Sequence, residues 1–97
     1  MKLRFSPRAV ENIVEAADFL RGRNPAAAEH VRAAIYDALQ TLILFPQAGR
    51  EQDAEGVRKI VTKRYSYLIY YTVDLAAEEI IILSVKHPAR DREYADK

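Results

Sequence analysis

Five side chains in the second half of the chain could together perform acid–base chemistry on a phosphodiester. His87 can take up and release a proton near neutral pH, and Tyr94 can donate a proton or stack on an unpaired base. Arg58, Arg64 and Arg90 are the cations that could hold negative charge developing on phosphorus. Cleavage of RNA by attack of a 2′-hydroxyl on the adjacent phosphate needs all three kinds of group. They converge only if the C-terminal tail folds back along the rest of the chain.

These residues also have structural explanations. A histidine at the end of a strand is commonly satisfied by backbone groups, which would account for His87. Arg58 follows a loop that contains Glu51, Asp53 and Glu55, and any of these carboxylates can pair with it. Both interpretations remain open on the sequence alone.

The segment from Arg58 to Arg64 also contains Lys59 and Lys63 and has no acidic residue. The net charge of +1 gives no global attraction to nucleic acid, so any such binding depends on local clusters. The cluster is explained equally well as an outer strand whose charges prevent edge pairing. Together with His87 and Arg90, these cations are our candidate binding residues.

Composition excludes several classes of site. The chain has 97 residues, 49% of them hydrophobic, which predicts one domain over residues 1–97 with one core. Because there is no cysteine, disulfides and thiolate chemistry are excluded. His30 and His87 lie far apart in the sequence, so we expect neither a metal nor a cofactor. No signal peptide or membrane-spanning run is evident, and we expect a cytoplasmic protein without a membrane partner.

The elements that must position these residues are mainly strands. Residues 57–73 and 80–87 are rich in β-branched and aromatic side chains and predict three antiparallel strands, with a short strand at residues 2–5. The first of the three strands should be an outer one, because it carries cations on both sides. The polar segment 46–56 is expected to be a surface loop.

The last strand is apolar on both sides and should lie inside the sheet. In a regular strand Ile80 and Ile82 would face one way, and Ile81, Leu83 and Val85 the other.

Two cap-and-proline signals predict two helices. Ser6 and Pro7 begin a helix that ends near Gly22, and Asn24-Pro25 begin a second one that continues to Pro46. The short turn between them predicts an antiparallel hairpin that covers one face of the sheet. The expected fold is therefore α+β: a short N-terminal strand and a two-helix hairpin packed on a three-stranded antiparallel meander.

Six segments in order carry a resemblance to a known family. They are Phe5-Ser6-Pro7-Arg8-Ala9, Asn24-Pro25-Ala26-Ala27-Ala28, Leu44-Phe45-Pro46-Gln47-Ala48-Gly49-Arg50, Gly56-Val57-Arg58, Tyr65-Ser66-Tyr67-Leu68-Ile69-Tyr70-Tyr71 and Ser84-Val85-Lys86-His87-Pro88-Ala89-Arg90. In these segments the chain resembles the RelE/ParE superfamily, the toxins of type II toxin–antitoxin modules, often labelled plasmid stabilisation proteins. The resemblance covers nearly the whole chain and implies the RelE/ParE-like fold.

The superfamily contains two kinds of toxin. RelE-type toxins are ribosome-dependent messenger RNA endonucleases with a strongly basic C-terminal segment, whereas ParE-type toxins poison DNA gyrase. Here Pro88 and Ala89 occupy the start of that segment, and the His87-to-Arg90 ending is more similar to the ParE side. The resemblance therefore favours a gyrase inhibitor without enzymatic activity. The alternatives are an mRNA endonuclease acting through the residues named above, and a non-toxic relative that only binds an antitoxin.

The resemblance also implies partners. These are a cognate antitoxin, whose C-terminal segment is disordered when free and wraps around the helix hairpin and sheet, and DNA gyrase or, in the alternative, the ribosome with mRNA. DNA would be contacted only through the antitoxin complex, which would repress its own operon. The Arg58-to-Arg64 cluster is the expected meeting place for antitoxin carboxylates.

Overall fold

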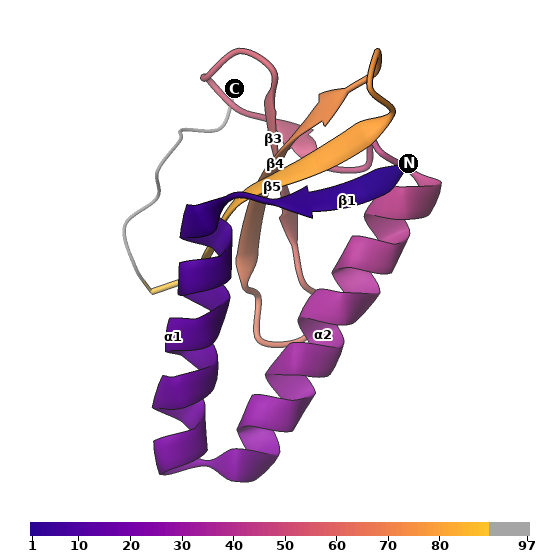
Figure 1. Cartoon of the computed structure of the whole chain (residues 1–97). Coiled ribbons are helices and arrows are strands. Elements are labelled where there is room, and N and C mark those ends of the chain that lie inside the picture. Colours follow the sequence, from indigo (N-terminus) through magenta and orange to yellow (C-terminus); the bar gives the residue numbers. More distant parts are fainter. Residues whose placement is uncertain (90–97) are drawn as a thin grey trace.

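The computed structural model describes residues 1–89, in which two helices pack on one side of a sheet (Figure 1). Every helix and strand predicted from the sequence is present, and a further short strand lies in the segment predicted to be a loop. Neither helix in this part of the chain is long and apolar enough to cross a membrane. In chain order the elements are β1 (Lys2–Phe5), α1 (Pro7–Arg23), α2 (Pro25–Leu44), β2 (Arg50–Glu51), β3 (Val57–Val61), β4 (Leu68–Asp74) and β5 (Glu79–Lys86).

Both helices begin at the predicted caps. The hydroxyl oxygen of Ser6 accepts a hydrogen bond from the N–H of Ala9 at 3.0 Å. The Oδ1 atom of Asn24 accepts one from the N–H of Ala27 at 3.2 Å. Asn24 also ends α1, because its own N–H donates to the carbonyl of Leu20. One residue therefore joins the two helices, and they form a tight hairpin.

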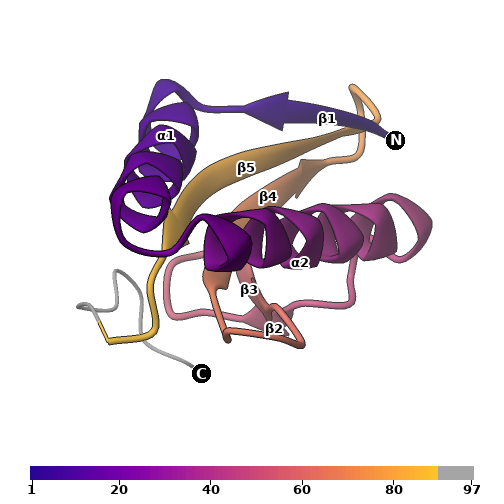
Figure 2. The same ribbon diagram turned by 90° about the horizontal axis from the view of Figure 1, so that it is seen from below.

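The sheet has five strands in the order β1-β5-β4-β3-β2 (Figure 2). Strands β3, β4 and β5 form the predicted antiparallel meander, and β5 lies inside the sheet as expected. The prediction of a three-stranded antiparallel sheet is wrong, because β1 adds in parallel to β5, and β2 adds antiparallel to β3. The sheet is therefore mixed. Parallel pairing of β1 joins the two ends of the chain, and no local sequence signal specifies it.

Strand β5 contains an irregularity that changes which side chains reach the core. The pairing of β4 with β5 shifts between Tyr70 and Tyr71, which leaves Leu83 without a counterpart. We predicted that Val85 would face away from Ile82. The shift reverses the alternation, and both side chains lie in the core.

Polar groups of α1 complete the edge of β5 where β1 ends at Phe5. The hydroxyl of Ser6 donates to the carbonyl of Leu83 at 2.9 Å, and the Oδ1 atom of Asn12 accepts from the N–H of Val85 at 3.0 Å. These two hydrogen bonds fix α1 beside the end of β5. They satisfy backbone groups that a longer β1 would otherwise have paired.

The core lies between the helix hairpin and one face of the sheet. The side chains of Ile13, Ala16 and Leu20 from α1 pack against it. Its buried members are Ala9 from α1; Val31, Ile35, Ala38, Leu39 and Leu42 from α2; and Tyr67, Ile69, Tyr71, Ile80, Ile82 and Val85 from the sheet side.

Candidate functional site

The three candidate residues for acid–base chemistry that the structure describes, Arg58, Arg64 and His87, do not lie in one place. Arg58 lines a cavity beside the 47–52 segment, Arg64 lines a groove along α2, and His87 lines a pocket between α1 and the end of β5. Arg90 and Tyr94 lie outside the residues that the structure describes. Each of the three described candidates therefore has different neighbours.

Arg58 holds the loop that precedes β3. Its Nη1 atom donates to the carbonyl oxygen of Gly49 at 2.8 Å and to that of Gln47 at 3.3 Å. Its Nη2 atom lies 3.6 Å from a carboxylate oxygen of Glu51, one of the acids expected to pair with it. These contacts occupy several donors of a side chain that is only 25% exposed. Arg58 therefore has a clear structural role.

Tyr71 of β4 holds the same loop from the side of the sheet. Its hydroxyl donates to the carbonyl of Pro46 and accepts from the N–H of Gly49, both at 2.8 Å. Burial raises the pKa of Tyr71, while the Gly49 hydrogen bond and the nearby charge of Arg58 oppose the rise. The expectation of a surface loop is wrong at Gly49 and Gln52, which are buried.

Lys59 is not on the surface. We predicted that β3 would be an outer strand with exposed cations, but β2 pairs with it at Arg58 and Lys59. Ile60 packs against the core, so Lys59 points to the other face of the sheet, where it is only 7% exposed. Tyr70, its partner across the ladder, is buried as well. The exposed cations of the cluster are therefore Lys63 and Arg64.

Lys63 and Arg64 lie in the turn between β3 and β4, which has an unusual backbone. Tyr65 and Ser66 both have positive φ values, 67° and 51°. This left-handed conformation costs about 1–2 kcal/mol for each residue that is not glycine. Such strain is common where a protein displays side chains for a function.

The turn borders a groove of about 380 Å³ between α2 and β3. Three alanines of α2 leave this space open, because their side chains are too short to fill it. The groove is apolar along its floor, and Lys63 and Arg64 lie at one end of it. Its lining residues are His30, Ala33, Ala34, Asp37, Ala38 and Thr41 of α2, and Ile60, Val61, Lys63 and Arg64 of β3 and the turn.

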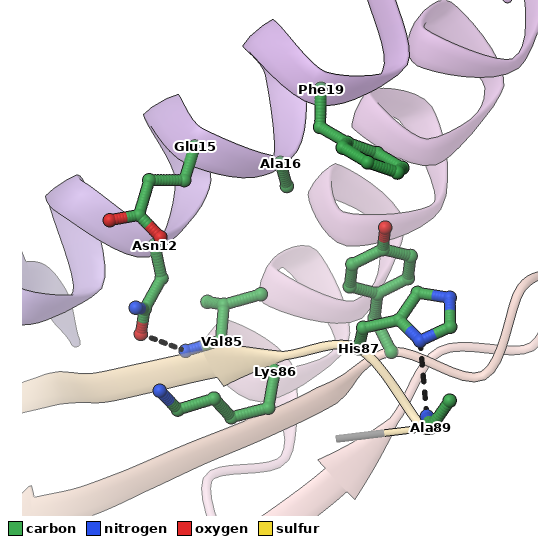
Figure 3. A pocket seen from close by; sticks show the side chains of 9 residues that line it. Asn12, Glu15, Ala16, Phe19, Val85, Lys86, His87 and Ala89 are labelled. Carbon is green, nitrogen blue, oxygen red and sulfur yellow. Dashed lines mark hydrogen bonds between the residues drawn. The ribbon is translucent and has the colours of Figure 1, made fainter. Parts of the chain in front are cut away.

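His87 lies in a pocket of about 410 Å³ (Figure 3). Its Nδ1 atom accepts a hydrogen bond from the N–H of Ala89 at 3.0 Å, so the neutral ring carries its proton on Nε2. The ring meets that of Tyr67 edge-on, with centroids 5.4 Å apart. Phe19 lies on the opposite wall, whereas Glu15 lies toward the other end of the pocket (Figure 3). The backbone contact is the kind expected of a strand-end histidine.

Sequence reasoning missed the pair formed by His30 and Tyr65. The Nδ1 atom of His30 lies 3.2 Å from the hydroxyl oxygen of Tyr65, and the guanidinium carbon of Arg64 lies 5.4 Å from the Tyr65 ring centroid. His30 and Tyr65 are 35 positions apart, and no local signal connects them. Glycine, asparagine and aspartate are the residues that indicate a left-handed turn, so Tyr65 and Ser66 give no such signal in the sequence.

Among residues 1–89, the candidate residues Arg58, Arg64 and His87 line three different cavities. Among residues 1–89 there is no group of three or more His, Cys, Asp or Glu side chains that could hold a metal ion. Arg58 is engaged by its own loop, and His87 lies in a different cavity from Arg64. Two cavities among the described residues are open to a partner: a groove with a cationic end and a pocket with an aromatic wall.

Comparison with known families agrees with this fold. A family model described as ParE toxin of type II toxin-antitoxin system, parDE, matches residues 3–92. The chain therefore belongs to the ParE toxin family, within the RelE/ParE superfamily that the sequence motifs resemble.

The individual proteins to which the chain is similar share less than 30% of its sequence. The chain is 28% identical over 86 residues to "Putative toxin Y4kP" of Sinorhizobium fredii, a match that covers 89% of this chain and 86% of that protein. It is similar in structure to a chain of the chromosomal ParDE toxin–antitoxin system of P. aeruginosa, with a TM-score of 0.75, 22% identity and coverage of 90% of this chain and 95% of that one. A chain of the intact E. coli RelBE complex gives a TM-score of 0.62 at 19% identity, covering 92% and 98%. These likenesses establish the shared α+β fold with its mixed sheet.

Proposed function

We propose that this protein is a toxin that inhibits DNA gyrase, and so blocks replication, by binding and without chemistry of its own. The observation that supports this most is that, among residues 1–89, the groups that RNA cleavage would require lie apart. Arg58 is held by the loop carbonyls, and His87 lines a different pocket from Arg64. Family membership supplies the class of toxin, and the site supplies the preference for binding.

A supercoiling assay tests this function directly. Purified protein, free of antitoxin, is titrated into gyrase with relaxed plasmid, and both loss of supercoiling and accumulation of cleaved DNA are scored. Inhibition near stoichiometric protein is the expected result. No effect at large excess, with the protein shown to be folded, would overturn the proposal and favour ribosome-dependent mRNA cleavage. If strong expression without antitoxin also leaves growth unaffected, the chain is a non-toxic relative.

The second part of the proposal is a cognate antitoxin that binds along the groove between α2 and β3. The groove has an apolar floor and two exposed cations at one end, Lys63 and Arg64. A segment that alternates apolar and acidic side chains fits this combination, whereas a nucleic acid backbone would leave the apolar floor uncovered. Both the P. aeruginosa and the E. coli relatives come from toxin–antitoxin systems.

Charge reversal tests this surface. The double variant Lys63→Glu/Arg64→Glu should bind the antitoxin at least tenfold more weakly, because both cations would become repulsive toward carboxylates. The matched control is Arg21→Glu, a change at an exposed arginine on α1 whose Nη2 atom lies 3.8 Å from Oδ1 of Asp18. Unchanged affinity of the double variant would remove this surface from the proposal. Lys59 is unsuitable for the test because it is buried.

A further inference from the structure

The cationic end of the groove contains more than the two basic residues of the turn. His30 of α2 reaches the turn through its contact with the hydroxyl of Tyr65, at 3.2 Å. Arg64 lies against the ring of the same tyrosine. His30, Lys63 and Arg64 all line the groove, and Tyr65 is 39% exposed beside them. Three nitrogen-bearing side chains and one hydroxyl thus surround the end of an apolar groove.

The turn holds these groups in place. Thr62 is 3% exposed, and its hydroxyl donates to the carbonyl of Arg64 at 2.6 Å and accepts from the N–H of Tyr67 at 2.9 Å. These two bonds close the loop and maintain the left-handed backbone of Tyr65 and Ser66. The turn thus fixes the backbone that carries Arg64 and Tyr65, and the contacts of Tyr65 with His30 and Arg64 place these side chains beside α2. A preformed arrangement of this kind lowers the entropic cost of binding.

We propose that this end of the groove is a carboxylate receptor, formed by His30, Lys63, Arg64 and Tyr65, whose affinity rises when His30 takes up a proton. The inference rests on the proposed function, because the occupant is an acidic side chain of the antitoxin segment that lies in the groove. It adds His30 and Tyr65 to the binding residues and makes the release of the antitoxin dependent on pH.

The hydrogen bond between His30 and Tyr65 explains the dependence. When the imidazole is neutral and Nδ1 accepts, the tyrosine hydroxyl donates its proton to His30 and is not available to a ligand. When the imidazole is protonated, Nδ1 becomes a donor and the direction reverses. The hydroxyl proton is then free to be donated to an incoming carboxylate, and the ring adds a positive charge nearby. Lower pH therefore strengthens the receptor by two effects.

The other charged groups near His30 set the size of the effect. Asp37 of α2 lines the same groove, and Lys63 and Arg64 line it from the turn. Glu29, the neighbour of His30 in sequence, is paired with Arg32 at 3.2 Å. Carboxylates of a ligand stay ionised above about pH 5, so their own titration does not cancel the gain between pH 8 and pH 5.5. A single added charge at a partly exposed site predicts about threefold to tenfold tighter binding at the lower pH.

The experiment measures binding of the full chain to the separately purified antitoxin of its own operon, by calorimetry at pH 5.5, 6.5 and 8.0 and constant ionic strength. The wild-type protein should bind about threefold to tenfold more tightly at pH 5.5 than at pH 8.0. His30→Gln should remove most of this ratio, and Tyr65→Phe, which keeps the ring beside Arg64, should reduce affinity more at pH 5.5 than at pH 8.0. Arg21→Gln, a change at an exposed charge on α1 that does not line the groove, should leave the ratio intact. Equal ratios for wild type and His30→Gln would overturn the inference.

A second measurement separates this inference from the proposed function. A short synthetic peptide of alternating leucine and glutamate is titrated at pH 5.5 while the NMR signals of His30 and Tyr65 are followed, and the same peptide with glutamine in place of glutamate is the control. Shifts with the acidic peptide alone support the receptor even if the antitoxin fails to bind, a result that would refute only the partner. Shifts with both peptides, or with neither, would overturn the proposed receptor. A single-stranded oligonucleotide is titrated separately, and shifts of the same signals with it would also overturn the proposal.

Discussion

The hydroxyl oxygen of Tyr71 occupies the space that a side chain at Gly49 would need. It accepts a hydrogen bond from the Gly49 N–H at 2.8 Å, and a Cβ atom at position 49 would lie 2.5 Å from it. The same ideal Cβ would lie 2.9 Å from the carbonyl oxygen of Lys59, which belongs to the sheet and cannot move easily. The loop before β3 is thus fitted to one buried tyrosine.

The first prediction follows from this contact. Gly49→Ala should lower the free energy of unfolding by about 2–4 kcal/mol, because Tyr71 must shift and its hydrogen bonds are lost. The matched control is Gly22→Ala, where an added Cβ has nothing within 4 Å and the residue is inside α1. That change should stabilise the protein by about 0.5–1 kcal/mol. Urea unfolding measures both, and a Gly49→Ala variant as stable as wild type would contradict the close fit.

A second prediction concerns alkaline pH. Burial raises the pKa of Tyr71 above the ordinary tyrosine value of 10.0. At a pH between the ordinary pKa and the raised pKa, Tyr71 is deprotonated in the unfolded chain but still protonated in the folded chain. The stability contributed by neutral Tyr71 is therefore complete below about pH 10 and is lost as pH rises further.

Tyr71→Phe checks this dependence. The variant should be less stable by about 1–2 kcal/mol at pH 7, because the buried N–H of Gly49 and the carbonyl of Pro46 lose their partner. The difference between wild type and variant should shrink above pH 10. The remaining tyrosines and lysines titrate in both proteins, so their contribution cancels in the difference between the two free energies of unfolding. A difference that stays constant to pH 11 would exclude this linkage.

Local signals predicted the helices, and long-range pairings escaped prediction. Ser6-Pro7 and Asn24-Pro25 specify their helix starts within a few residues. The parallel pairing of β1 with β5 joins opposite ends of the chain, and the shift beside Leu83 depends on the partner strand. Neither leaves a periodic pattern in the sequence.

The same distinction applies to the functional surface. The contact of Arg58 with Glu51 was predictable, because an acidic loop directly precedes a basic strand. The burial of Lys59 was not, because alternation alone does not reveal which face of a strand becomes covered. The approach of His30 to Tyr65 depends on the packing of α2 beside the turn, so it could be seen only in the structure.

A third prediction separates binding from catalysis at His87. His87→Ala should change gyrase inhibition by less than about threefold if the protein acts by binding, because the ring contacts Tyr67 and the backbone of Ala89. Loss of a proton-transfer residue from an RNA-cleaving enzyme would instead lower its rate by about 100-fold or more. The supercoiling assay and a ribosome-dependent mRNA cleavage assay are run on the same preparations. Tyr94→Ala, at a position outside the described residues, is tested in parallel.

The last prediction concerns the strain in the turn after β3. Ser66 has a φ of 51°, so Ser66→Gly should remove a conformational cost of about 1–2 kcal/mol. Glycine also gives the unfolded chain more freedom, which costs about 0.4–1 kcal/mol. The relief exceeds the entropic cost, and we expect a net gain of about 0.5 kcal/mol in urea unfolding.

Ser6→Gly is the matched control with the opposite sign. It removes the hydroxyl that caps α1 at Ala9 and donates to Leu83, so it should cost about 1 kcal/mol. If Ser66→Gly destabilised the protein as much as Ser6→Gly, the turn would not be strained. Thr62→Val removes both hydrogen bonds of the Thr62 hydroxyl, including the one that the buried N–H of Tyr67 donates to it. This change should therefore lower the free energy of unfolding by about 1–2 kcal/mol.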